Sequence, residues 1–126
     1  MDSAEVDARP GEVARVGRDA GFVPAMNGIE RAAFLRSLER LSMARRIEEA
    51  GEIDASISLY EVCVEEGFPD EEPYVRLWRI YDRRGQPRDA LRVCEACLGL
   101  PYCVSQETRT QMRDFIMIHV TQRRGI

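Results

Sequence analysis

Apolar residues recur every three or four positions along most of this chain, which is the spacing of helices that bury one side. The first such stretch covers residues 29–50 and contains neither Pro nor Gly. Asn27 and Glu30 suit a capping box at its start, and Gly51 suits its end. The pattern predicts one long amphipathic helix. The apolar positions expected on its buried side are Ile29, Ala33, Leu35, Leu38, Leu41, Ala44 and Ile47.

Four shorter helices are predicted after Gly51, each bounded by Gly or Pro. Pro73 and Pro87 suit the first turn of a helix, where a missing N–H costs nothing. The predicted ranges are 54–66, 73–84, 87–98 and 105–123.

The N-terminal part of the chain has a weaker pattern. Residues 1–10 are polar and end in Pro, and we expect them to form a mobile tail. Residues 11–20 could form a short helix with Val13 and Val16 on its apolar side. Residues 1–26 are therefore predicted to be a tail plus a short helix that precede the main domain.

The main domain repeats with a period of thirty-four residues, most clearly at Gly51 and Gly85. The neighbouring positions recur in the same register: Ala44-Arg45 as Trp78-Arg79, Ile47 as Tyr81, Ser56-Ile57 as Ala90-Leu91, and Val62-Cys63 as Ala96-Cys97. A fixed period of this length predicts stacked helical hairpins that bury their apolar faces against each other. Proteins of this type usually provide a binding surface and are seldom enzymes.

The repeat resembles the tetratricopeptide repeat (TPR) family. The matching residues are the turn glycines Gly51 and Gly85, small Ser56 and Ala90, aromatic Tyr60, Cys63 and Cys97 at the later small position, and Pro69 and Pro101. Two positions depart from the pattern: Trp78 replaces a small residue and Cys94 replaces an aromatic one. The resemblance implies an all-α, right-handed α-α superhelix in a domain spanning 27–126. Its repeats would cover about 37–70 and 71–104, and the helix at 105–123 would form a partial third unit.

In the TPR family the first helix of each hairpin lines a concave groove. Arg45, Arg79 and Arg113 are thirty-four residues apart and would form a ladder of guanidinium groups there. Such groups bind carboxylates through paired hydrogen bonds, so an acidic peptide or partner protein is the expected ligand. The alternative is that these arginines are solvated and paired with nearby Glu. The predicted partner-binding residues are Arg45, Arg76, Arg79, Arg83, Arg109 and Arg113.

Two other functions compete with this one. Residues 65–70, followed by Tyr74, also resemble a pentatricopeptide repeat, which would imply binding of single-stranded RNA. Asp70 fits that pattern, but Arg76 occupies the family's other base-reading position. The apolar C-terminal helix suggests self-assembly into a homo-oligomer instead. Its predicted interface consists of Met112, Phe115, Ile116 and Met117.

No pattern of residues predicts catalysis, a metal or a cofactor. Cys94 and Cys97, with Cys63 and Cys103, could bind zinc, but the repeat places three of them at buried positions, so core cysteines are the better interpretation. His119 is the only His and has no predicted partner. Glu48, Glu49 and Glu52 are best explained as a solvated helix end.

Composition narrows the partner further. The net charge of −4 argues against general nucleic-acid binding, and all eighteen basic residues are Arg. The family's chaperone-binding clamp needs Lys and Asn in the groove, whereas this chain has no Lys and its one Asn is Asn27. No signal peptide or membrane-spanning stretch is visible, and four Cys without a secretory signal suggest a cytoplasmic location. We therefore expect a cytoplasmic protein-interaction module or adaptor.

Overall fold

The computed structural model describes residues 27–101 and 104–123, and this part of the chain is all-α. Its helices are α2 (Gly28–Glu49), α3 (Ile53–Glu65), α4 (Glu72–Arg83), α5 (Pro87–Leu98) and α6 (Gln106–Arg123). The five predicted helices are confirmed, each within a residue or two of the expected ends. The short helix expected at 11–20 lies outside the described residues. None of the five helices is long and apolar enough to cross a membrane.

The thirty-four-residue period is visible in the backbone hydrogen bonds of the helix ends. After α2, the Glu52 N–H donates to the Ile47 carbonyl; after α4, the Gln86 N–H donates to the Tyr81 carbonyl. Both turns pass through a glycine with positive φ, Gly51 at 88° and Gly85 at 71°. This is the Schellman geometry, in which glycine adopts the left-handed conformation that a side chain disfavours. The sequence repeat is therefore a structural repeat.

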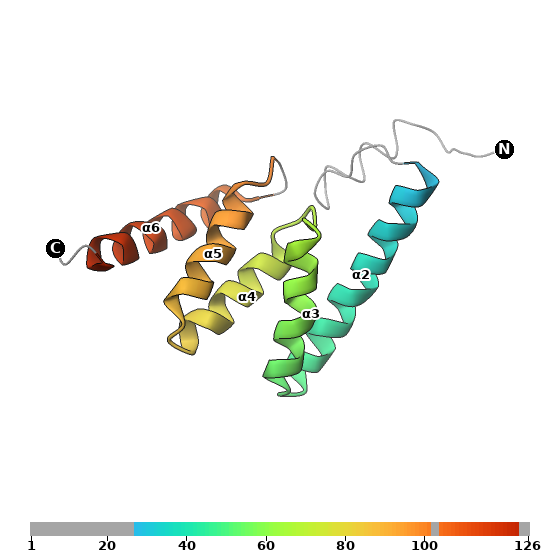
Figure 1. The fold of residues 1–126 in the computed structure, drawn as a ribbon, viewed down its shortest axis with the longest axis horizontal. Helices are drawn as coiled ribbons and strands as arrows, with labels where there is room; N and C mark the ends of the chain where they lie inside the picture. The colour runs from blue at the N-terminus through green and yellow to red at the C-terminus, as the bar shows by residue number, and fades with distance from the viewer. Residues whose placement is uncertain (1–26, 102–103, 124–126) are drawn as a thin grey trace.

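The helices pack in chain order, so that α3 lies between α2 and α4, and α5 lies between α4 and α6 (Figure 1). The core follows this array and is built largely from positions that recur with the period, including Ala44 with Trp78 and Met112, Ser56 with Ala90, and Cys63 with Cys97. Apart from Trp78 and Met112, the residues at these positions are small, which leaves room for the neighbouring helix.

The apolar stripe predicted for α2 is only partly buried. Leu41 and Ala44 lie in the core, but Ile29, Leu35 and Leu38 are 82%, 51% and 37% exposed, and Ala33 is exposed as well. The expectation was wrong for these four because α2 packs mainly on α3, and no other described helix covers its far side. The polar Ser37 is buried instead, since its hydroxyl donates a 2.8 Å hydrogen bond to Glu66.

The outer side of α6 is polar in the first part of the helix, whereas Met117 and Ile118 are exposed further along it. In α4, Leu77 and Ile80 are buried, whereas the residues thirty-four positions later, Gln111 and Asp114, are exposed on α6. A polar outer face is typical of the last helix of a repeat array, because it removes the need for a further packing partner.

Candidate functional site

The six predicted partner-binding arginines fall into two groups. Arg45 and Arg76 are engaged inside the domain. Arg76 Nη1 lies 3.1 Å from Glu48 Oε1, and its Nε lies 3.0 Å from Glu72 Oε2. Arg45 Nε lies 2.9 Å from the same Glu72 oxygen, although the N–H is not directed at it. A ligand would have to displace these ion pairs in order to use either arginine.

The other four arginines lie on α4 and α6. Arg79, Arg83 and Arg113 are exposed and Arg109 is half-buried. Within the described residues none of them forms an ion pair. The two helices meet where the rings of Trp78 and Phe115 pack edge to face, with centroids 5.7 Å apart. We call Arg79, Arg83, Arg109 and Arg113 the open arginines.

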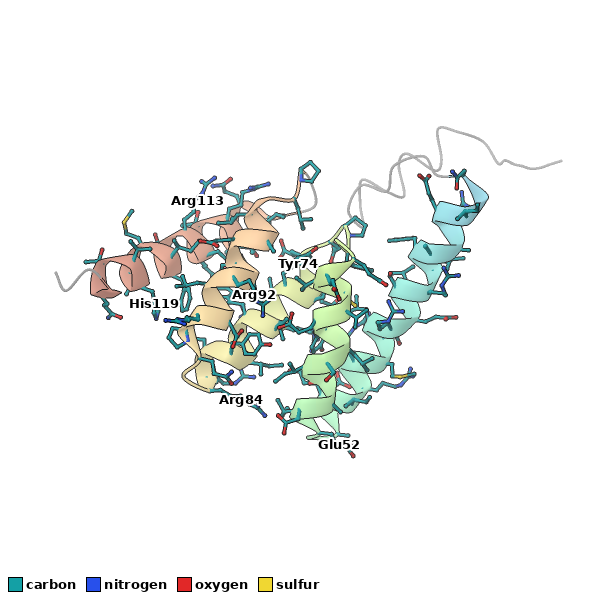
Figure 2. The ribbon with its side chains drawn as sticks, viewed as in Figure 1. Glu52, Tyr74, Arg84, Arg92, Arg113 and His119 are labelled. Atoms are coloured by element: carbon teal, nitrogen blue, oxygen red, sulfur yellow. The ribbon has the colours of Figure 1, made fainter. Side chains whose placement is uncertain are left out.

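Arg79 and Arg113 keep equivalent positions because α4 and α6 begin in the same register. The Val75 N–H donates to the Glu71 carbonyl, and thirty-four residues later the Arg109 N–H donates to the Ser105 carbonyl. Figure 2 shows Arg113 at the edge of the array opposite to Arg84, which lies at the turn between α4 and α5. Arg84 is paired with Asp54 at 2.7 Å and does not belong to the open group.

Two side-chain triads hold the array together, each consisting of a Glu, a Tyr and an Arg from three consecutive helices. In the first, Glu48 of α2 accepts hydrogen bonds from the Tyr60 hydroxyl of α3, at 2.5 Å, and from Arg76 of α4. Burial, followed by the Glu48 hydrogen bond, raises the pKa of Tyr60, so this phenol remains protonated and donates. The triad therefore fixes α4 against the first hairpin.

The second triad repeats this arrangement one helix later. Glu61 of α3 accepts from the Tyr81 hydroxyl of α4 and from both terminal nitrogens of Arg92 on α5, at 3.1 and 2.6 Å. Burial alone would raise the pKa of Glu61, but its bonds from Arg92 and Tyr81 outweigh burial and lower it. Arg92 also contacts Asp89, which keeps the guanidinium in place.

A further polar contact fixes the start of α6. The carboxylate of Glu71 accepts from the Ser105 N–H at 2.6 Å and from the Thr108 hydroxyl at 2.8 Å. Glu71 precedes α4 and these two residues open α6, so the beginnings of the two arginine-bearing helices are tied together. The spacing of the open arginines across α4 and α6 is thereby constrained.

Cys63, Cys94 and Cys97 are completely buried, and burial raises the pKa of both Cys94 and Cys97 to about 12. Among the described residues no group of His, Cys, Asp or Glu side chains is arranged to hold a metal ion. Cys103 lies outside the described residues. His119 packs on the Phe115 ring with centroids 4.0 Å apart, and its Nδ1 lies 3.0 Å from the Phe115 carbonyl oxygen.

The residues predicted as an oligomer interface are divided between the core and the surface. Met112 and Phe115 are buried within this chain, and Ile116 is half-buried against the same core. Met117 is 68% exposed, and its neighbour Ile118 is 53% exposed. Only the last part of the predicted surface is therefore open to a second chain.

Sequence reasoning missed the triads. The sequence pattern predicts a solvated helix end for Glu48, yet this side chain is half-buried and accepts two hydrogen bonds. A signal was present, because buried Tyr60 and Tyr81 each require a partner for their hydroxyl groups. The partners could not be assigned, since they lie twelve and twenty residues away.

Comparison with models of protein families, with curated proteins and with solved structures gave no significant match for this chain. The class of the protein therefore rests on its own geometry, which is an all-α fold with helical-repeat character.

Proposed function

We propose that this chain is a protein-interaction module that binds an acidic segment of a partner protein along α4 and α6. In this proposal the hairpins follow the TPR-like right-handed superhelix, and the exposed sides of α4 and α6 belong to its groove. The main support for the proposal comes from the open arginines. Four guanidinium groups lie on two tied helices and form no ion pair within the described residues.

Placement on two tied helices sets this group apart, because Arg31, Arg36, Arg46 and Arg88 also form no ion pair within the described residues. Arg40, Arg76, Arg84 and Arg92 all have a carboxylate within ion-pair distance, so acidic partners are plentiful in this acidic chain. Arg79 and Arg83, like Arg109 and Arg113, are four residues apart on one helix and share a face, so their unpaired guanidinium groups repel one another and favour an incoming anion. Planar two-pronged hydrogen bonding makes carboxylates the natural ligands of such groups.

The half-buried side chains of Val75 and Ile116 lie near the open arginines in sequence, and both pack partly on the core. A ligand with apolar residues beside its carboxylates would therefore gain affinity from this surface as well as charge selectivity. This role is that of an adaptor, with no catalytic step and no cofactor.

A fluorescent hexaglutamate peptide at low salt tests the proposal by anisotropy. The key variant is Arg79→Ala/Arg113→Ala, and the matched control is Arg46→Ala/Arg88→Ala, which removes the same charge from exposed positions on α2 and α5. Each charged hydrogen bond contributes about 1.5–3 kcal/mol. We therefore expect the Kd of the key variant to rise by about tenfold or more, while the control changes little.

Two outcomes would count against the proposal. Equal weakening in both double variants would indicate general charge attraction instead of a site. Tighter binding of single-stranded oligouridine than of hexaglutamate, lost in the key variant, would favour the RNA-binding alternative. A pull-down from extract with the same variants then identifies the natural partner.

A further inference from the structure

The N-terminal half of α2 extends past its neighbours α3 and α4 (Figure 1). Ser37 donates to Glu66, which follows α3, and Arg45 contacts Glu72, the first residue of α4. Residues 28–36 therefore lie beyond the ends of both neighbouring helices. At about 1.5 Å per residue this segment is roughly 13 Å long.

Leu35 lies at the centre of an exposed patch on this half of α2. Its side chain is 51% exposed, and its nearest neighbours on the helix surface are the residues three and four positions away, Arg31, Ala32, Leu38 and Glu39. All four are exposed as well, and neither Arg31 nor Glu39 forms an ion pair with another described residue. We call these five residues the Leu35 patch. It is apolar in the middle, with one positive and one negative residue at opposite ends.

We propose that the Leu35 patch binds the same patch of a second copy of this chain, so that two α2 helices pair in antiparallel orientation. The two-fold axis of this dimer would pass through Leu35, perpendicular to the helix. Such an axis brings a residue that lies a given number of positions before Leu35 against the residue the same number of positions after it in the partner. The pairing of every side chain in the contact follows from this rule.

The patch is complementary to itself in this arrangement. Arg31 meets the partner's Glu39, and Glu39 meets the partner's Arg31, which gives two symmetry-related ion pairs. Ala32 meets the partner's Leu38, so a small side chain leaves room for a large one. A parallel pairing would instead place Arg31 against the partner's Arg31 and Glu39 against the partner's Glu39. Repulsion between like charges therefore selects the antiparallel pairing.

The contact would be small. It removes Leu35 and Leu38 of both chains from water and ends where Gly28 meets the partner's Ser42, two small residues that allow close approach. One pair of helices in contact over about four turns lies at or below the low end of the roughly 1,200–2,000 Å² that stable interfaces bury. We therefore expect a reversible dimer that dissociates at micromolar concentrations.

The dimer does not depend on the proposed function. The Leu35 patch belongs to α2, whereas the open arginines belong to α4 and α6. Each dimer would present two sets of open arginines, so a partner with two acidic segments would gain affinity from binding both.

Sedimentation equilibrium of the full chain over a micromolar concentration series tests the proposal through charge exchange. We expect Arg31→Glu to raise the Kd of the wild-type dimer by about tenfold or more, because two pairs of carboxylates then face each other. The matched control is Arg88→Glu, which makes the same change at an exposed position on α5. Arg31→Glu/Glu39→Arg should restore the wild-type Kd, since the exchange recreates both ion pairs. Circular dichroism confirms that each variant keeps its helix content.

Disulfide cross-linking tests the position of the two-fold axis. In a Cys103→Ser chain, Leu35→Cys should form a covalent dimer on oxidation by air, because the two new thiols meet at the axis. Ile29→Cys is the control, since Ile29 is 82% exposed but lies on another side of the helix, six positions from Leu35. Equal cross-linking of both variants would contradict the assigned axis.

Three results by sedimentation would overturn the proposal. The first is a wild-type chain that stays monomeric over the whole series. The second is a dimer that persists in Arg31→Glu but dissociates in Met117→Glu, which would assign the contact to α6. The third is equal weakening by Arg31→Glu and Arg88→Glu, which would indicate a general effect of charge.

Discussion

Glu48 and Arg76 are twenty-eight residues apart and form a 3.1 Å ion pair that joins α2 to α4 across the intervening helix α3. The Tyr60 hydroxyl of α3 donates to the same carboxylate oxygen, so one Glu serves three helices. A few polar side chains therefore stabilise the array in addition to its apolar core.

Removal of the Glu48 carboxylate should lower the free energy of unfolding more than removal of the Tyr60 hydroxyl does. Glu48→Ala leaves both the buried Tyr60 hydroxyl and Arg76 without this acceptor, and we expect the free energy of unfolding to fall by about 1–3 kcal/mol. Tyr60→Phe leaves the Arg76 bond intact and should cost less. Urea denaturation of both single variants and the double variant measures the coupling. Purely additive effects would show that the two residues do not act as a unit.

The two turn glycines should each contribute to the stability of the fold through their backbone conformation alone. Gly51 and Gly85 have positive φ, yet a Cβ at either position would meet nothing within 4 Å. Gly51→Ala and Gly85→Ala should therefore each lower the free energy of unfolding by about 1–2 kcal/mol. Gly28→Ala is the control, because Gly28 also has open space but no positive φ. An equal loss in the control would contradict this explanation.

Acid should weaken the second triad. The pKa of Glu61 lies below its ordinary value of 4.5 in the folded protein, so its contribution is full above pH 4.5 and is lost as pH falls through the folded pKa. Glu61→Gln should lower the free energy of unfolding by about 1–2 kcal/mol at pH 7, and the gap to wild type should narrow below about pH 4.5. Urea titrations at several pH values measure this difference in the free energy of unfolding. A difference that does not change with pH would show that the charge of Glu61 does not contribute to stability.

The buried thiols should react only when the array opens. Burial keeps the pKa of Cys94 and Cys97 near 12, so little thiolate exists at pH 8 and no reagent reaches it. In a Cys103→Ser chain, we expect a thiol-reactive dye to label the native protein far more slowly than the urea-unfolded protein. Rapid labelling of the native chain would show that α5, or α3 with Cys63, is not held in the core.

Local sequence signals predicted the helices well because each boundary is encoded by neighbouring residues. Asn27 and Glu30 exchange the two capping-box hydrogen bonds that the sequence suggested, at 2.8 and 3.0 Å. Gly51 and Gly85 adopt the turn geometry that glycine favours. Such signals act over three or four residues and do not depend on how helices pack.

Burial and ion pairing, which depend on how the helices pack against each other, were predicted less well. Leu35 and Leu38 have helical spacing, yet they are exposed because α2 packs by the side that carries Ser37 and Leu41. The ladder of equivalent arginines also divides: Arg45 pairs with Glu72, whereas Arg79 and Arg113 pair with no described carboxylate. Periodicity places side chains on a face, but pairing depends on residues roughly thirty positions away.

The edge-to-face contact between Trp78 and Phe115 gives the molecule an internal optical reporter. Trp78 is the only tryptophan, and its neighbour belongs to the terminal helix α6. Release of α6 would place the indole in water and shift its emission, while an opening confined to α2 would leave that spectrum unchanged. Fluorescence can therefore separate local detachment of the arginine-bearing helix from global unfolding, without any added label.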